Sequence, residues 1–76
     1  MSEGLPVVTS KQVIRIAERL GFRLHRQKGG HAIYVRESDK LRIVVPVHGG
    51  RDLKPKTLAA IIADMGLSVA EFRKLL

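Results

Sequence analysis

Apolar residues recur with a helical period near the start of the chain, at Val13, Ile14, Ala17 and Leu20. Polar residues fill most of the positions between them, the pattern of an amphipathic helix. Thr9 and Gln12 have the spacing of an N-terminal capping box. Gly21 suits the residue that ends a helix in the left-handed conformation. The pattern therefore predicts a helix that begins after Thr9 and ends before Gly21.

The next segment alternates between apolar and polar positions, as β-strands do. Strands are predicted over residues 22–28, 31–36 and 41–45. Gly29 and Gly30 suit the two-residue turn of a β-hairpin, and residues 37–40 suit a second turn. Because short turns join neighbouring antiparallel strands, the pattern predicts a three-stranded antiparallel meander.

Helical spacing returns after residues 46–52, which are predicted to form a loop. Pro55 suits the first turn of a helix, and an apolar stripe follows it from Leu58 to Met65. Ser68 and Glu71 form a second capping box before a short last helix. The order α-β-β-β-α-α predicts an α+β fold with the helices on one face of the sheet. We expect one domain over residues 9–76, preceded by a flexible arm over residues 1–8.

The chain has 76 residues, no cysteine and three histidines. A domain of this size has a thin core, so a large enclosed pocket is not expected. The lack of cysteine excludes disulfides, thiolate zinc sites and cysteine nucleophiles, and no two histidines have the spacing of a metal-binding pair. The sequence shows no leader and no apolar run of about 20 residues. We therefore expect a cytoplasmic protein with no metal, no cofactor and no membrane contact.

The charge is strongly positive, with 14 Lys and Arg against 7 Asp and Glu, a net +7. Nearly all of the excess lies in residues 22–56. A basic segment of this kind favours a polyanionic partner, nucleic acid before an acidic protein, although surplus charge can serve solubility alone. Aromatic residues make up only 4% of the chain, so few side chains can stack on bases.

One constellation could carry chemistry: Arg26–His31 at the first turn, together with Pro46–Gly50 before the second helical region. The glycines before His31 let a ligand approach the backbone closely, and a neutral histidine can accept a proton at cellular pH. RNA supplies its own nucleophile, the 2′-hydroxyl, so a base beside phosphate-binding cations can cut a strand. Strict alternation places His31 on the face of Ile33 and Val35, which we expect to be the core face and which would bury it. His31 is also the first residue after the turn, where alternation constrains least, so exposure remains the alternative.

Five further positions are candidate contacts to a nucleic acid. Tyr34 could stack on a base or direct its hydroxyl to a phosphate, although a half-buried strand tyrosine is the common case. Arg51, Lys54 and Lys56 flank the start of the second helix, where the helix dipole adds positive potential; solvated loop charge is the alternative. His48 has either a direct role or a loop hydrogen bond.

Several segments in order resemble the HicA family of toxins: Leu20–Phe22, Arg26–His31 with Ile33 and Tyr34, Val45–His48, Lys54–Leu58 and Ile61–Ser68. The resemblance runs from about residue 11 to residue 76. It implies a double-stranded-RNA-binding-domain-like fold, metal-independent cleavage of messenger RNA, and inhibition by a cognate HicB-like antitoxin. It assigns the catalytic histidine to His31 and a structural or substrate-supporting role to His48. The chain departs from the family at Gly30, where Ser or Thr is frequent, and at Ala32, where a second His is frequent.

The sequence and the resemblance together predict an endoribonuclease toxin, an mRNA interferase with His31 as general base. The residues expected to contact RNA are Arg26, Lys28, Gly29, Gly30, Tyr34, His48, Arg51, Lys54 and Lys56. Two alternatives remain: a non-catalytic RNA-binding module of the same fold, and a basic protein-interaction domain that never contacts RNA.

Overall fold

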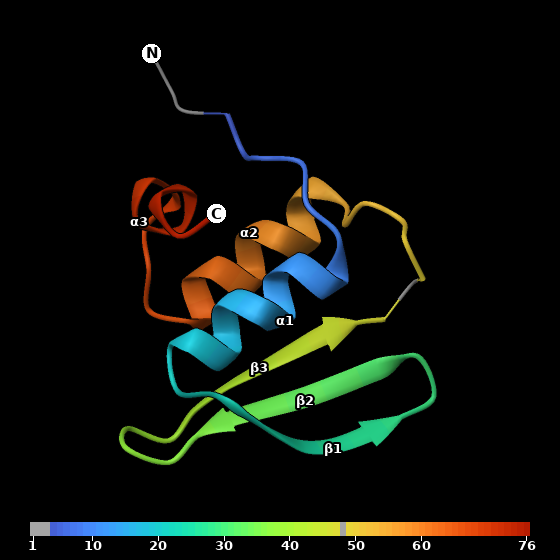
Figure 1. Cartoon of the computed structure of the whole chain (residues 1–76), viewed down its shortest axis with the longest axis vertical. Helices are drawn as coiled ribbons and strands as arrows, with labels where there is room; N and C mark the ends of the chain where they lie inside the picture. Colours follow the sequence, from blue (N-terminus) through green and yellow to red (C-terminus); the bar gives the residue numbers. More distant parts are fainter. Residues whose placement is uncertain (1–3, 48) are drawn as a thin grey trace.

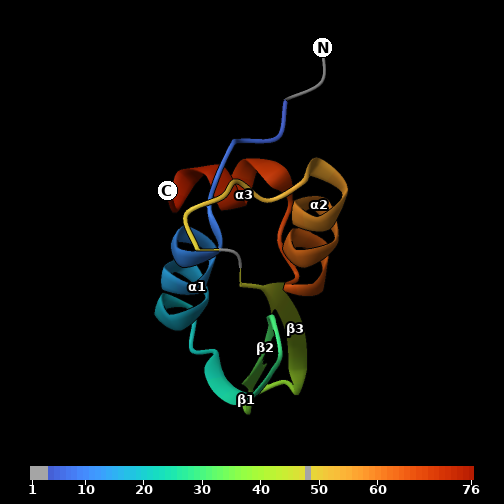
Figure 2. The same cartoon turned by 90° about the vertical axis from the view of Figure 1, so that its right-hand side faces the viewer.

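A computed structural model describes residues 4–47 and 49–76 of the chain (Figure 1). Its elements are α1 (Ser10–Arg19), β1 (Arg23–Lys28), β2 (His31–Arg36), β3 (Leu41–Pro46), α2 (Pro55–Asp64) and α3 (Val69–Lys74). The strands form one antiparallel sheet in the order β1-β2-β3. The helices lie on one side of this sheet (Figures 1 and 2). The predicted α+β arrangement is therefore confirmed.

Local hydrogen bonds explain where two of the helices begin. The Thr9 hydroxyl accepts a bond from the Gln12 backbone N–H at 3.3 Å, and the Gln12 side chain accepts one from the Thr9 N–H at 2.9 Å. Ser68 and Glu71 form the same reciprocal pair before α3. Each pair satisfies two N–H groups that a helix start would otherwise leave unbonded. Both predicted capping boxes are thus confirmed.

The core lies between the helices and one face of the sheet. On the strands, the buried residues of this core face are Ala32, Tyr34, Ile43 and Val45. Ile33 and Val35 point the other way and are half-buried, so the expectation that they face the core was wrong. Every second residue of a strand lies on the same face of the sheet, but this alternation does not decide which face the helices cover. Ala32 is small and Tyr34 has a hydroxyl, so hydrophobicity alone favoured the wrong set.

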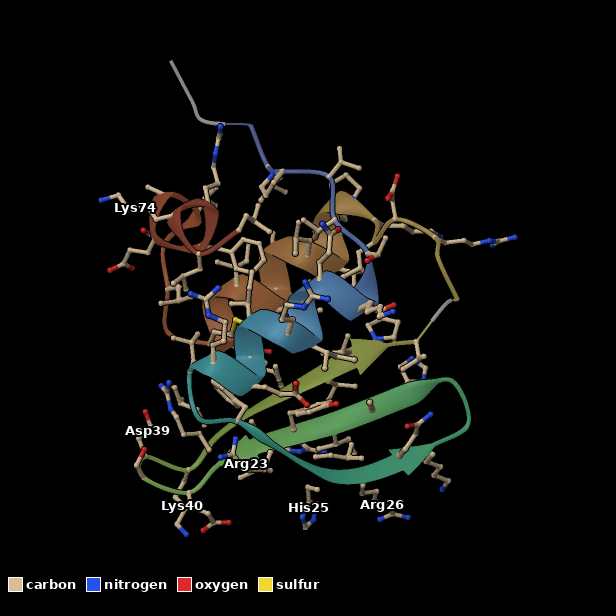
Figure 3. All side chains as sticks on the ribbon, in the orientation of Figure 1. Arg23, His25, Arg26, Asp39, Lys40 and Lys74 are labelled. Carbon is tan, nitrogen blue, oxygen red and sulfur yellow. The ribbon has the colours of Figure 1, made fainter. Side chains whose placement is uncertain are left out.

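The other side of the sheet is not covered by a helix (Figure 2). We call it the open face; its residues, from the strand register, are Arg23, Arg26, Lys28, His31, Ile33, Val35, Arg42, Val44 and Pro46. The register of β1 shifts between Leu24 and Arg26, a β-bulge at His25. Figure 3 shows His25 and Arg26 both pointing away from the helices. The bulge therefore adds basic side chains to the open side of β1.

The segment before α1 is attached to the domain at two points. Val8 is buried in the core, and its carbonyl accepts a hydrogen bond from the Leu53 N–H at 2.9 Å. The carbonyl of Gly4 accepts a bond from the Arg73 guanidinium at 3.1 Å. This packing places Val8 with the domain rather than with the arm expected over residues 1–8. Among the described residues, no helix combines the length and apolar content needed to cross a membrane.

Arg36 joins the end of β2 to the end of α1. Its guanidinium donates to the Leu20 carbonyl at 3.1 Å and to both oxygens of the Asp39 carboxylate at 2.8 and 3.0 Å. It also lies 4.7 Å from the centroid of the Phe22 ring, a cation–π contact. The hydrogen bond from Arg36 holds the pKa of the Asp39 carboxyl below its ordinary value.

The ion pair between Arg36 and Asp39 makes the free energy of unfolding depend on pH. Because the folded pKa of Asp39 is depressed, its contribution is present at neutral pH and is lost as the pH falls below about 4. Asp39→Asn is expected to be less stable than the parent at pH 7, and the difference should shrink steadily as the pH falls below about 4. Urea unfolding across this range measures the difference. Asp64→Asn, which removes an exposed carboxylate on α2, is the control; a gap for Asp39→Asn that stays constant with pH would contradict the prediction.

Candidate functional site

His31 is exposed at the corner of the sheet where β2 begins and β3 ends. The turn before it has Gly29 in the left-handed region, with φ 58°, where glycine has no Cβ penalty. His31 pairs with Lys28 on β1 and with Pro46 on β3. It shares a face with Ile33, as alternation predicted. That face is the open face, so His31 is not buried.

A pocket of about 310 Å³ lies at this corner. Its lining residues come from three parts of the chain: His31 and Pro46 from the strands, Arg51–Leu53 from the loop, and Lys54 and Thr57 from the start of α2. His31 lies 20 residues before Arg51 in the sequence, so only folding brings the start of β2 next to the loop and the start of α2. Most of its described lining residues are exposed, so the pocket opens to solvent.

Backbone contacts at two places hold the loop around the pocket. The Val47 N–H donates to the Gly30 carbonyl at 2.6 Å, next to His31. The Leu53 N–H donates to the Val8 carbonyl, and Leu53 itself is buried. Thr9 and Asp52 form an isolated antiparallel bridge. The loop is thus tied to both the hairpin turn and the segment before α1, and Arg51 and Lys54 line the same pocket as His31.

The pocket combines positive charge with groups that can move or donate a proton. Arg51 and Lys54 contribute two cations, and Asp52 is the one acid among the lining residues that the structure describes. Lys54 is the N-cap of α2, and its side chain makes no capping hydrogen bond. The positive end of the helix dipole adds to the potential there. With the Thr57 hydroxyl and the His31 imidazole, the site can bind a phosphate and accept a proton from a group next to it.

The structure brings together some of the predicted residues and separates others. Lys28 is the cross-strand neighbour of His31, while Arg26 lies two pairs further along β1, opposite Ile33. Lys56 is exposed on the first turn of α2 and does not line the pocket. His48 lies outside the described residues. The charge cluster predicted at the start of the second helix therefore reaches the pocket through Arg51 and Lys54.

Tyr34 does not belong to this surface. It lies on the core face and is 6% exposed. Burial, and to a lesser extent the negative charge of Glu18, raise the pKa of its hydroxyl above the ordinary value. Its ring is not available for stacking on a base, so we do not include it in the site.

Sequence reasoning missed two polar lining residues, Asp52 and Thr57. Thr57 lies in the segment Lys54–Leu58 that resembles the HicA family, but that resemblance assigns it no role. Asp52 belongs to no motif, and only its closeness to Arg51 and Lys54 in sequence could have suggested it. Within residues 4–47 and 49–76, no three His, Asp or Glu side chains gather as metal ligands would.

Comparison with known families places the chain in a toxin family. The sequence model described as the HicA toxin of bacterial toxin–antitoxin systems matches residues 10–67. The matched region is most of the chain and contains α1, the whole sheet, α2 and every residue that lines the pocket. No curated protein matches the chain.

Proposed function

Because the chain belongs to the HicA toxin family of bacterial toxin–antitoxin systems, we propose that it is an endoribonuclease that cleaves messenger RNA at the His31 pocket. The observation that carries this proposal is the exposed imidazole at the edge of a pocket with two cations and a helix N-terminus. The function is consistent with the basic charge of the chain, since RNA is a polyanion.

In the proposed reaction, the imidazole of His31 takes the proton of a ribose 2′-hydroxyl. The 2′-oxygen attacks the adjacent phosphorus, and the bond from phosphorus to the 5′-oxygen breaks. The leaving 5′-oxygen takes a proton from water, which can enter the open pocket. The products are one strand that ends in a 2′,3′-cyclic phosphate and one that begins with a 5′-hydroxyl. The substrate supplies the nucleophile, so the protein needs only a base and groups that stabilise the phosphate.

The phosphate is held by the positive side of the pocket. Arg51 can form two parallel hydrogen bonds to a phosphate, and Lys54 adds a point charge. Lys28 lies across the strand pair from His31 and can contact the next phosphate along the strand. Gly29 and Gly30 allow the backbone of the RNA to pass close to the turn. These contacts position the strand and carry little base preference.

Membership of a toxin–antitoxin family also implies a protein partner, the antitoxin. We propose that it is a HicB-like protein and that it inhibits the toxin in the cytoplasm, where messenger RNA is translated.

The proposed reaction is tested with a long single-stranded RNA, the purified chain and EDTA. The expected products carry 2′,3′-cyclic phosphate and 5′-hydroxyl ends, and a DNA strand of the same sequence stays intact because it lacks the 2′-hydroxyl. Binding to RNA with no cleavage would reduce the function to that of an RNA-binding module. If neither binding nor cleavage is seen, the basic surface serves a protein partner alone.

The pocket cations give a prediction for binding. Binding to 2′-O-methyl RNA, which lacks the free nucleophile, is expected to weaken linearly on a plot of log affinity against log salt. Lys54→Gln is expected to reduce the slope by about 0.7, the loss of one phosphate contact to a single strand. Lys74→Gln, on α3 and away from the sheet (Figure 3), is the matched control. Equal slopes for the two variants would remove Lys54 from the RNA contact.

A further inference from the structure

The exposed side of α1, which is not part of the open face, carries a row of cations. Lys11, Arg15 and Arg19 are exposed and four residues apart, which places them on one side of the helix, about 6 Å apart along its axis. We call these three residues the α1 row. Burial, and then the charge of Glu18, raise the pKa of the Tyr34 hydroxyl, so Glu18, the one acid of α1, lies toward the sheet.

Lys11 and Arg15 do not serve the stability of α1. The first turn of this helix contains no acid, although the positive end of a helix dipole favours negative charge and disfavours positive charge. Within the part of the chain that the structure describes, neither Lys11 nor Arg15 forms an ion pair. Arg19 differs, because its guanidinium donates to the Leu75 carbonyl at 3.3 Å. Two cations of the row are therefore available to a ligand.

A groove connects the α1 row to the surroundings of the His31 pocket. It has a volume of about 510 Å³, and its described lining residues are Ser10, Lys11, Ile14, Val47, Gly49 and Gly50. The chain on either side of this loop, at Pro46 and from Arg51 onward, lines the His31 pocket. A Cβ added at Gly49 or Gly50 would meet no atom within 4 Å, so the loop is open to a ligand there. Figures 1 and 2 show the loop after β3 passing the start of α1.

The α1 row fits the backbone of RNA better than it fits a protein. RNA has one negative charge per nucleotide, so an extended strand can place successive phosphates along a line of evenly spaced cations. Protein interfaces, in contrast, have an apolar centre. The exposed residues of α1 are all polar: Lys11, Gln12, Arg15, Glu18 and Arg19.

We propose that the α1 row binds the RNA strand where it leaves the His31 pocket. The strand crosses the loop at Gly49 and Gly50, and its phosphates then contact Lys11 and Arg15, with Arg19 at the far end. This inference rests on the proposed function, because the strand in the pocket is the substrate. The contacts are to phosphates and therefore add affinity without base preference. They also make the toxin prefer a long RNA, since a fragment that fills only the pocket does not reach the row.

The test compares two 2′-O-methyl RNAs, one of about 20 nucleotides and one of about four, which spans only the pocket. In Lys11→Gln/Arg15→Gln, affinity for the long RNA is expected to fall by at least about tenfold. The slope of log affinity against log salt should fall by about 1.4, the loss of two phosphate contacts of about 0.7 each. Affinity for the short RNA should change by less than about twofold, because this RNA does not reach α1. Arg19 is left unchanged because of its bond to Leu75.

Lys40→Gln/Lys74→Gln is the matched control. It removes the same charge from the turn after β2 and from α3 (Figure 3), and it should reduce the affinity for the long RNA by less than about threefold, since net charge alone acts weakly through salt. Far-ultraviolet circular dichroism shows whether each variant is folded. Lys11→Gln alone is a milder change, with an expected loss of slope of about 0.7.

The outcomes separate this inference from the proposed function. A salt slope that is unchanged in folded Lys11→Gln/Arg15→Gln would overturn the α1 row as an RNA contact. Equal losses of affinity for the long and the short RNA would also overturn it, because they would locate the effect in the pocket. So would a variant that binds both RNAs normally and no longer binds the antitoxin, since the row would then be a protein surface. Failure of the parent to cleave RNA would overturn the proposed function but leave these binding results intact.

Discussion

Replacement of His31 by alanine is expected to lower the rate of RNA cleavage by about 100- to 10,000-fold. This is the usual contribution of a general base, and the described lining residues of the pocket include no second imidazole. The fold should be unaffected, because His31 is exposed and makes its strand contacts through the backbone. The cleavage rate of a labelled RNA in EDTA, with protein in excess, measures the chemical step.

His25→Ala is the matched control for this experiment. His25 is also an exposed histidine of the sheet, but it lies at the bulge of β1 and does not line the pocket. The His25→Ala variant is expected to cleave RNA at a rate within about twofold of the parent, since His25 touches no reacting group. Binding of 2′-O-methyl RNA should be similar in all three proteins. Equal cleavage by His31→Ala and the parent would show that another group acts as the base or that a contaminant cuts the RNA.

Phe72→Ala is expected to lower the free energy of unfolding by about 3–5 kcal/mol, the usual cost of a large cavity in a core. Phe72 is 0% exposed although it belongs to α3, beyond the end of the family match at residue 67. Small domains have roughly 5–15 kcal/mol of stability in total, so the variant should be partly unfolded at 37 °C. Urea unfolding followed by circular dichroism gives the difference.

Leu76→Ala is the control for Phe72→Ala, because Leu76 is 54% exposed at the end of the chain. Its effect is expected to stay within about 0.5 kcal/mol. A loss of less than about 1 kcal/mol for Phe72→Ala would mean that α3 contributes little to the folding unit. A large loss would show that the domain extends beyond the region shared with the family.

Features that depend on neighbours in sequence were predictable from the sequence. The capping boxes at Thr9 and Ser68 join residues three positions apart, and the turn at Gly29 requires only a residue that tolerates positive φ. The order of elements and the antiparallel sheet follow from the same local patterns. His31 was identified because its glycines and basic neighbours lie in one short segment, which also carries the resemblance to the HicA family.

Only the tertiary structure decided which face of the sheet is covered. Alternation assigns Ala32 and Tyr34 to one face and Ile33 and Val35 to the other. Which face becomes buried depends on which set of side chains packs against the helices without voids or clashes. This choice exposes His31 and buries Tyr34. The pocket depends in addition on a loop that hydrogen-bonds to Val8 and Gly30, so that Arg51 and Lys54 line the same pocket as His31. No local pattern encodes such a contact, because it forms between segments that meet only when the core is packed.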